Sequence, residues 1–304
     1  MAPLVSVLVP VYNSINFVDD CINSILAQTY VNIEILIADD FSTDGSREAI
    51  RKYTRDTRVK LILNERNIGI TNNCNQLLFM SSGKYISLFA GDDIMLPNKL
   101  DFQVKLMERM PNYSFCYHDV DVFQSETGNT LYSTRRIYGS PILTVHDVIR
   151  RMGIPGGMSV MFKRDNTPSA GFDTRLSYAS DWLFQIDLAM SGDIGYINTI
   201  LARYRKHGTN NGKDLASYEA EFPKVLSFAE IRYPKLARTC AQGHARYCAG
   251  LAFRQDSILN FRVYMKKALK SDSSLTYYLA LFLSYIPFFF KFKSLIVSLS
   301  KICC

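Results

Sequence analysis

The chain has 304 residues, of which 48% are hydrophobic and 21% are charged, and its formal net charge is +7. This composition is that of a folded protein with room for one large domain and an appendage, and it excludes a disordered chain. The basic residues are spread along the sequence, whereas a nucleic-acid-binding surface shows a dense basic stripe with interleaved aromatic residues. We therefore expect no nucleic-acid partner.

The cysteines and histidines do not indicate a disulfide framework or a zinc site. The chain has seven cysteines without a Cys-x-x-Cys pair, and its four histidines lack the spacing of zinc ligands. Cys21, Cys74 and Cys116 lie in apolar runs and are expected to be buried free thiols. The first ten residues lack the basic segment of a secretory signal. These features favour a reducing, cytoplasmic location.

The first 120 residues alternate between two patterns. Short, β-branched apolar runs predict strands, and segments with an apolar stripe at helical spacing predict helices. The expected strands span residues 5–9, 33–38, 59–63, 84–89 and 113–118. The expected helices span residues 17–28, 44–53, 70–80 and 97–110. This alternation predicts an α/β fold with right-handed βαβ units and a mostly parallel sheet flanked by helices.

Beyond residue 120 the alternation loosens. Residues 124–140 are polar and contain glycine, which predicts a loop over one edge of the sheet. Residues 158–163 predict another strand, and residues 181–190 predict a helix with one apolar side. Past Gly212 the chain consists of helical segments rich in aromatic residues and lysine. The expected divisions are a first domain at 1–212, with halves of about 1–120 and 121–212, and a helical C-terminal region at 213–304.

A long apolar segment lies near the end of the chain. Residues 275–290 contain no charged residue, and Lys291, Lys293 and Lys301 follow. As a helix this segment is ~24 Å long, which is short against the ~30 Å hydrocarbon core of a bilayer, and Pro287 interrupts it. Its aromatic residues and flanking lysines favour a helix that lies in the headgroup region of a membrane. The alternatives are a helix packed on the protein or in a homo-oligomer, and a true membrane span.

Two pairs of adjacent carboxylates follow two of the expected strands. Asp39 and Asp40 come after the second strand, and Asp92 and Asp93 come after the fourth. Ligands of open α/β sheets bind outside the carboxyl ends of the strands, so both pairs are expected at one crevice. The first pair suits hydrogen bonds to a base or a ribose, and the second suits a divalent cation that carries phosphates. The structural alternatives are a helix N-cap or a turn.

Asp181 stands at the start of a predicted helix, immediately before Trp182. An aspartate at this place is often an N-cap, and its functional interpretation is a general base that takes a proton from an acceptor hydroxyl. Asp119 and Asp121 form a further Asp-x-Asp triplet after a strand. One metal ion rarely needs two carboxylate clusters, so this triplet is expected to face the acceptor or to support the crevice.

Seven segments in sequence order resemble a known family. They are Val5–Asn13 (VSVLVPVYN), Ser24–Tyr30 (SILAQTY), Ile37–Ser46 (IADDFSTDGS), Asn67–Gly69 (NIG), Gly91–Asp93 (GDD), Ser180–Trp182 (SDW) and Tyr204–His207 (YRKH). Together they look like a family 2 glycosyltransferase with the Rossmann-like GT-A fold, of the type that builds bacterial surface polysaccharides. The resemblance covers roughly residues 4–210 and does not extend into the tail.

The resemblance implies an inverting transferase that uses a nucleotide-diphospho-sugar, usually a UDP-sugar, together with Mn²⁺ or Mg²⁺. It places Asp181 at the catalytic base and Asp93 at the metal. The nucleotide-sugar-binding positions that it implies are Pro10, Tyr12, Asn13, Asp39, Asp40, Asn67, Asp92, Arg205 and His207. Many relatives carry an Asp two places before the last metal-motif Asp, where this sequence has Gly91. This departure leaves open which of Asp92 and Asp93 binds the metal directly.

The resemblance and the apolar tail also suggest where the reaction takes place. A cytoplasmic enzyme held peripherally on the inner face of the cell membrane suits a saccharide or lipid-linked oligosaccharide acceptor, as in O-antigen or capsule biosynthesis. The donor sugar and the linkage position are not indicated by the sequence.

Three other functions were weighed against this one. A nicotinamide-dependent enzyme needs Gly-x-Gly-x-x-Gly after its first strand, where this chain has Pro-Val-Tyr-Asn. A sugar nucleotidyltransferase needs a glycine-rich phosphate loop near its start, which this sequence lacks. A non-catalytic, membrane-associated nucleotide-sugar-binding scaffold remains the alternative, although such a protein is expected to lose the carboxylates that are retained here.

Overall fold

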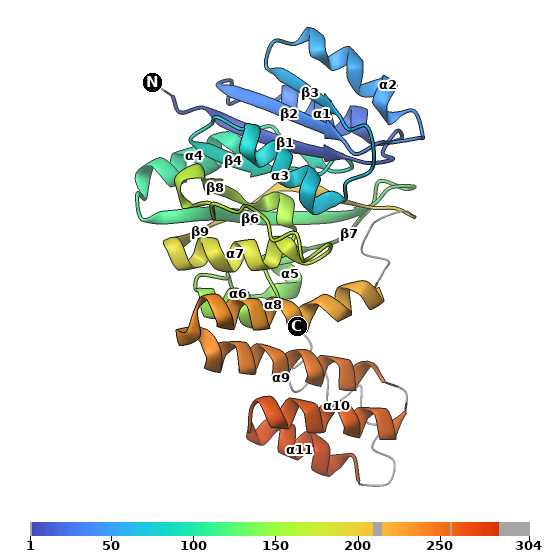
Figure 1. Cartoon of the computed structure of the whole chain (residues 1–304), viewed down its shortest axis with the longest axis vertical. Helices are drawn as coiled ribbons and strands as arrows, with labels where there is room; N and C mark the ends of the chain where they lie inside the picture. Colours follow the sequence, from blue (N-terminus) through green and yellow to red (C-terminus); the bar gives the residue numbers. More distant parts are fainter. Residues whose placement is uncertain (1, 209–214, 256, 286–304) are drawn as a thin grey trace. The chain divides into compact units, whose positions relative to one another are not determined.

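The computed structural model describes residues 2–208, 215–255 and 257–285 (Figure 1). The chain divides into two compact units. The first unit comprises Met1–Val148 and Gly153–Glu221, and the second comprises Ile149–Met152 and Phe222–Cys304. The predicted boundary between residues 212 and 213 lies outside the described residues.

A nine-stranded sheet lies at the centre of the first unit, counted over the described residues. Its hydrogen-bonded order is β3-β2-β1-β4-β8-β6-β9-β5, and β7 pairs with β6 beside this path. The strands are β1 (Val5–Val11), β2 (Ile33–Asp39), β3 (Val59–Leu63), β4 (Tyr85–Leu88), β5 (Ile94–Met95), β6 (Tyr113–Gln124), β7 (Thr130–Ser133), β8 (Met161–Lys163) and β9 (Asp193–Lys206).

The first four strands form the parallel part of the sheet, as the sequence predicts. Strands β1 and β2 are buried along their full length because both faces of the sheet are covered. One face packs on α1, α2 and α4, and the other packs on α3. In this register Asp39 lies beside Val11 and Leu63, so the strands end level with one another.

Most helices of the first unit lie close to their predicted positions, but the two between residues 134 and 150 are not predicted from the sequence. They are α1 (Val18–Leu26), α2 (Ser46–Arg51), α3 (Ile70–Met80), α4 (Lys99–Arg109), α5 (Thr134–Tyr138), α6 (Val145–Arg150, whose last two residues belong to the second unit) and α7 (Ser180–Ser191). Helix α1 shows why the apolar stripe is a reliable signal, since Val18, Cys21, Ile22 and Ile25 are all buried against the sheet. Cys21, Cys74 and Cys116 are buried free thiols, as expected.

The second half of the sheet is mixed. Strand β8 pairs antiparallel with β4 and with β6, whereas β6 runs parallel to β9. The short β5 pairs antiparallel with β9, which places Ile94 opposite Arg203. The sequence pattern does not predict β5 or β9, because β5 has two residues and β9 mixes polar with apolar positions.

The predicted loop over residues 124–140 is wrong. Strand β7 pairs antiparallel with β6, and α5 follows it directly. The hairpin between them closes where Gly128 N donates to Gln124 O at 2.8 Å. Strand β7 is an edge strand with partly exposed side chains, so its polar composition resembles that of a loop.

The second unit is helical, which confirms the predicted helical C-terminal region. It contains the later part of α8 (Leu215–Arg232), then α9 (Ala237–Arg254), α10 (Ile258–Ser271) and α11 (Leu275–Leu283). Phe253 of α9 packs edge-on against Phe261 of α10, with ring centroids 5.3 Å apart. None of the described helices is long and apolar enough to cross a membrane. Residues 286–304, with Pro287 and the three tail lysines, lie outside the described residues.

Candidate active site

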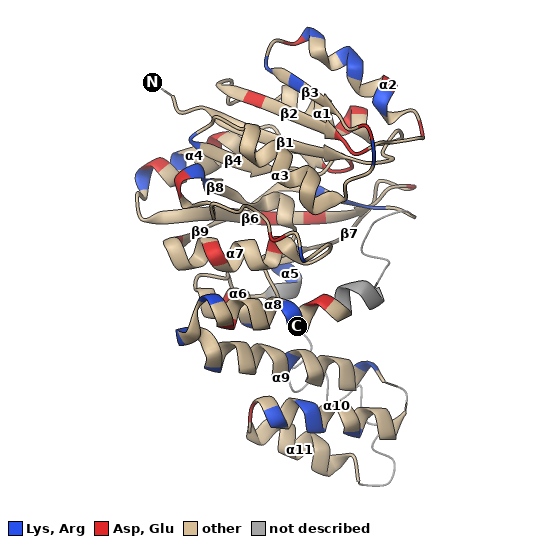
Figure 2. Ribbon diagram, viewed as in Figure 1, with Lys and Arg blue, Asp and Glu red and all other residues tan. Residues whose placement is uncertain are grey.

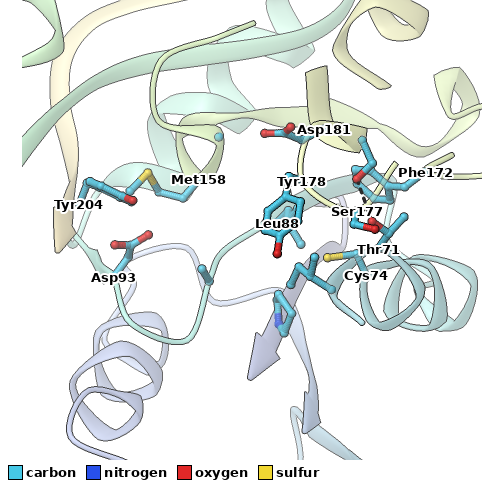
Figure 3. Close-up of a pocket in the computed structure, with 15 residues that line it drawn as sticks. Thr71, Cys74, Leu88, Asp93, Met158, Phe172, Ser177, Tyr178, Asp181 and Tyr204 are labelled. Carbon is cyan, nitrogen blue, oxygen red and sulfur yellow. Dashed lines mark hydrogen bonds between the residues drawn. The ribbon is translucent and has the colours of Figure 1, made fainter. Parts of the chain in front are cut away.

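Two adjoining cavities lie at the carboxyl ends of the parallel strands. The first cavity, of about 280 Å³, is lined by Pro10, Tyr12, Asp40, Asn67 and Asp92 among others. The second cavity, of about 270 Å³, is lined by Asp93, Asp181, Met158 and Tyr204 among others (Figure 3). The two share the wall residues Pro10, Ile70, Ala90, Ser177 and Tyr178. Asp40, Asp92, Asp93 and Asp181 thus line one continuous crevice, whereas Asp39 lines neither cavity.

Asp40 holds the loop that carries Asn67. Its Oδ1 accepts a hydrogen bond from Ile68 N at 2.8 Å, and its Oδ2 accepts one from Gly69 N at 2.9 Å. Asn64 donates to the same Oδ1 from 3.2 Å. Asp40 is buried apart from its part in the cavity wall. These hydrogen bonds tie the end of β2 to the loop that forms part of the wall of the first cavity.

Asp39 and Asn13 lie next to the first cavity in sequence but do not line it. Asp39 is fully buried, and its Oδ2 accepts a hydrogen bond from Ser42 N and lies 3.4 Å from Arg47 Nε. Its Oδ1 is buried without a hydrogen-bond partner within the part of the chain that the structure describes. Asn13 accepts from Thr43 N through Oδ1, which joins the end of β1 to the turn after β2.

Asp93 is held by strand β9. It is buried, and its Oδ1 accepts a hydrogen bond from the backbone N of Arg205 at 2.9 Å. Burial, followed by the charge of neighbouring Asp92, raises the pKa of Asp93 well above its usual value. Because β9 is absent from the predicted elements, this link between residues 112 positions apart is visible only in the structure.

Arg205 and His207 both contact Asp92. Arg205 donates from Nε to the Asp92 carbonyl at 2.8 Å and pairs through Nη2 with Asp20 at 2.9 Å. His207 Nε2 lies 3.1 Å from Asp92 Oδ2, and its ring packs at a tilt against Phe17 with centroids 4.3 Å apart. The guanidinium of Arg205 also lies over the Phe17 ring. Asp20 and Phe17 were missed by the sequence analysis, since nothing local distinguishes them from other residues of a helix start.

Asp181 lies in the first turn of α7 and faces the second cavity. Its Oδ1 accepts a hydrogen bond from Trp182 N at 2.8 Å. Burial raises the pKa of Asp181 to about 6. At neutral pH the carboxylate is ionised and poorly solvated, which suits a general base.

Asp119 lies outside the crevice, where it accepts hydrogen bonds from other side chains. Its Oδ2 accepts from the Tyr196 hydroxyl at 2.7 Å, and its Oδ1 lies 3.4 Å from Thr134 Oγ1. The side chain is buried and lines a separate small cavity with Tyr196 and Pro155. The Asp-x-Asp triplet is therefore apart from the acidic pairs of the crevice.

The sequence matches the family described as Glycosyl transferase family 2 over residues 6–166, more than half of the chain. The chain belongs to this family. Among its relatives, the putative teichuronic acid biosynthesis glycosyltransferase TuaG of Bacillus subtilis is 32% identical over 209 residues, which cover 67% of this chain and 79% of TuaG. WfgD of Escherichia coli, a UDP-Glc:alpha-D-GlcNAc-diphosphoundecaprenol beta-1,3-glucosyltransferase, is 29% identical, with 66% of this chain and 77% of WfgD covered.

Solved structures confirm the fold of this glycosyltransferase. Staphylococcus aureus TarS in complex with UDP-GlcNAc has a TM-score of 0.68 at 14% identity, with 98% of this chain and 91% of that chain covered. The mannosyltransferase PcManGT of Pyrobaculum calidifontis in complex with GDP-Man and Mn²⁺ has a TM-score of 0.62 at 18% identity, with 97% and 84% covered. At these identities the similarity establishes the GT-A fold, as predicted.

The carboxylates of Asp92 and Asp93 are suitable ligands for a hard divalent cation. Asp92 and Asp93 offer carboxylate oxygens, the ligands that Mg²⁺ and Mn²⁺ prefer. The raised pKa of buried Asp93 means that its negative charge is poorly compensated by the protein, and a cation would compensate it. No group of three or more metal-binding side chains occurs among the described residues. A cation at this site would be held by one or two carboxylates, with phosphate oxygens and water as its other ligands.

The aromatic wall of the crevice is not predicted from the sequence. Tyr178 and Tyr204 line the second cavity (Figure 3). Tyr178 also lines the first cavity. Burial raises the pKa of Tyr204 to about 12, so its hydroxyl remains protonated. Tyr204 lies inside the YRKH segment, which could have identified it, but no local signal marks Tyr178.

Proposed function

We propose that this glycosyltransferase is an inverting enzyme that moves a sugar from a UDP-sugar to an acceptor hydroxyl. One observation carries the proposal: Asp93 and Asp181 line the same cavity, and this cavity adjoins the one lined by Asp40 and Asn67. A nucleotide in the first cavity would direct its diphosphate towards Asp92 and Asp93. Its sugar would then lie in the second cavity, beside Asp181.

In the reaction Asp181 takes the proton from the acceptor hydroxyl as the oxygen attacks the anomeric carbon. The attack comes from the face opposite the nucleotide, so an α-linked donor gives a β-linked product. Asp93 and Asp92 would hold Mn²⁺ or Mg²⁺, which neutralises charge on the departing diphosphate. The backbone N–H of Arg205 fixes Asp93, while the Arg205 side chain and His207 fix Asp92.

The remaining predicted residues have two roles in this proposal. Pro10, Tyr12, Asp40 and Asn67 line the first cavity and are assigned to the nucleotide. Asp39 and Asn13 order the turn behind it. Transfer is assigned to residues 1–212, with the donor bound by residues 1–120 and the acceptor by residues 121–212.

The acceptor that we propose is a saccharide or a lipid-linked oligosaccharide of a surface polysaccharide. The printed name of WfgD describes a diphosphoundecaprenol-linked acceptor, and that of TuaG describes teichuronic acid biosynthesis. Such an acceptor would require the enzyme at the cytoplasmic face of the cell membrane. TarS and PcManGT, whose complexes hold UDP-GlcNAc and GDP-Man with Mn²⁺, are consistent with a nucleotide-sugar and a metal here.

The proposed membrane contact is supported by the surfaces of α10 and α11. Leu275, Tyr278, Leu279 and Phe282 are more than half exposed and recur at helical spacing on α11. Exposed lysines lie on α10, as Figure 2 shows in blue. An apolar stripe beside cationic side chains suits the headgroup region of an anionic bilayer. Packing of the same stripe in a homo-oligomer is the competing outcome.

The test is release of UDP from UDP-glucose, UDP-galactose and their N-acetyl forms, with and without Mn²⁺ and acceptor. We expect one donor to be turned over with Mn²⁺, and chelation to remove the activity. Asp93→Asn should lose the Mn²⁺ dependence of UDP binding, whereas Asp121→Asn, outside both cavities, should retain it. Tight nucleotide binding without turnover on any acceptor would instead establish the non-catalytic scaffold.

A further inference from the structure

A buried carboxylate from α8 holds the chain segment that precedes Asp181. Glu221 Oε1 accepts a hydrogen bond from Ser177 N at 2.8 Å. Its Oε2 accepts from Tyr178 N at 2.8 Å and from Ala179 N at 2.9 Å. Glu221 is 7% exposed and is the last residue of the first unit, so these contacts lie within that unit. Three consecutive amides are thus bound by one side chain 42 to 44 positions away.

The contact with Glu221 reaches the N-cap residue of α7. The N-cap residue of α7 is Ala179, which has no side-chain hydrogen bond to offer to the free amides. Unpaired amides at a helix N-terminus attract a negative charge, and a buried carboxylate is tolerated only when such donors satisfy it. Glu221 therefore binds the amide of the N-cap residue Ala179 and the two amides before it, and Asp181 lies two residues beyond the last amide held.

The segment fixed by Glu221 carries the side chain that borders both cavities. Tyr178 is 36% exposed and lines the first cavity with Asp40 and Asp92, and the second with Asp93 and Asp181. In the proposed reaction the transferred sugar lies between the diphosphate and Asp181. An aromatic ring at this junction offers a flat apolar face to the C–H groups of a sugar.

We infer that Glu221 is a positioning residue for transfer, which fixes Ser177–Ala179 so that the Tyr178 ring contacts the transferred sugar and selects it. This inference rests on the proposed function. Tyr178 touches the substrate in this account, and Glu221 acts through it. The alternative is that Glu221 only stabilises the fold, in which case Tyr178 and Glu221 would affect transfer independently.

The test is a double-mutant cycle of Glu221→Gln and Tyr178→Ala in the full chain, with Glu230→Gln as the control on an exposed carboxylate of the same helix. Each single variant should lower kcat by about tenfold to a hundredfold, since small misplacements near the reacting groups cost this much. Affinity for UDP with Mn²⁺ should change less than about threefold. The double variant should be no slower than the slower single variant, because coupled residues are not additive. The ratio of rates for UDP-glucose and UDP-N-acetylglucosamine should change in both single variants.

Hydrogen exchange gives a readout that needs no activity. The amides of residues 177–179 should lose protection in Glu221→Gln and keep it in Glu230→Gln, and Glu221→Asp should recover part of both protection and kcat. Lost protection with additive kcat effects and an unchanged donor ratio would overturn the positioning role. Unchanged protection would overturn the contact itself. If the wild-type chain turns over no donor while protection is still lost, the proposed function fails and the Glu221 contact stands.

Discussion

Replacement of Asp181 by asparagine should make the protein more stable and inactive. Asparagine keeps the size of the side chain and the oxygen that accepts from Trp182 N, and it removes the charge. Burial raises the pKa of this carboxyl from 3.8 to about 6. A pKa shift of this size means that the ionised carboxylate destabilises the fold by at most about 3 kcal/mol.

The direction of the Asp181 pKa shift determines the pH range in which Asp181→Asn stabilises the protein. The folded-state pKa of Asp181 is above the unfolded value, so the cost is complete above about pH 6 and disappears as the pH falls to about 4. Asp181→Asn should therefore raise the unfolding free energy by about 1–3 kcal/mol at pH 8 and by little at pH 4. In Tm this is a gain of several degrees, at about 2–4 °C per kcal/mol.

The assay is thermal and urea unfolding of both proteins from pH 4 to pH 8, with exposed Asp165→Asn as the control. The same variant should transfer no sugar, while wild-type kcat should fall as the pH drops through about 6 and the base is protonated. A variant that is less stable at pH 8, or whose gain is the same at every pH, would refute the reasoning from burial. Near-normal transfer by the variant would refute the base assignment.

Three further outcomes follow from other sites. Burial alone would raise the pKa of Glu34, but hydrogen bonds, first that from Lys60, lower it to about 2. Urea titrations should therefore show that Glu34→Gln lowers the unfolding free energy by about 1–3 kcal/mol at pH 7, and by less as the pH falls from about 4.5 to 2. Burial lowers the pKa of Lys99 to about 7, so Lys99→Met should stabilise the fold by about 2–4 kcal/mol at pH 6. That gain should shrink from pH 7 to pH 10 in the same titrations, and a gain that grows with pH would contradict it. Phe282→Ser should weaken flotation with anionic vesicles severalfold if α11 contacts the membrane, and leave it unchanged if the stripe packs in an oligomer.

The parallel half of the sheet and the position of its acidic residues can be predicted from local sequence alone. The residue patterns of β1, β2 and α1 involve only residues close together in the sequence. Whether each segment is a strand or a helix can therefore be predicted without knowing what it packs against. Asp40 and Asp92 follow directly from where such strands end, because carboxyl ends of parallel strands share one edge. The family resemblance was likewise carried by short local segments, and Asp181 was found through one of them.

The way in which these residues are held depends on contacts between segments that are distant in the chain. Strand β9 has no clear pattern of its own, yet it pairs with β6 and β5 and brings Arg205 to Asp92 and Asp93, over 100 positions away in the chain. The buried Glu221 gives no sequence signal either, because its partners are backbone amides, which every residue has. Contacts between distant segments depend on the packing of the whole unit. The burial that raises the pKa of Asp181 also results from this packing. The candidate reactive groups are thus apparent from local sequence, whereas their orientation and charge state depend on long-range packing.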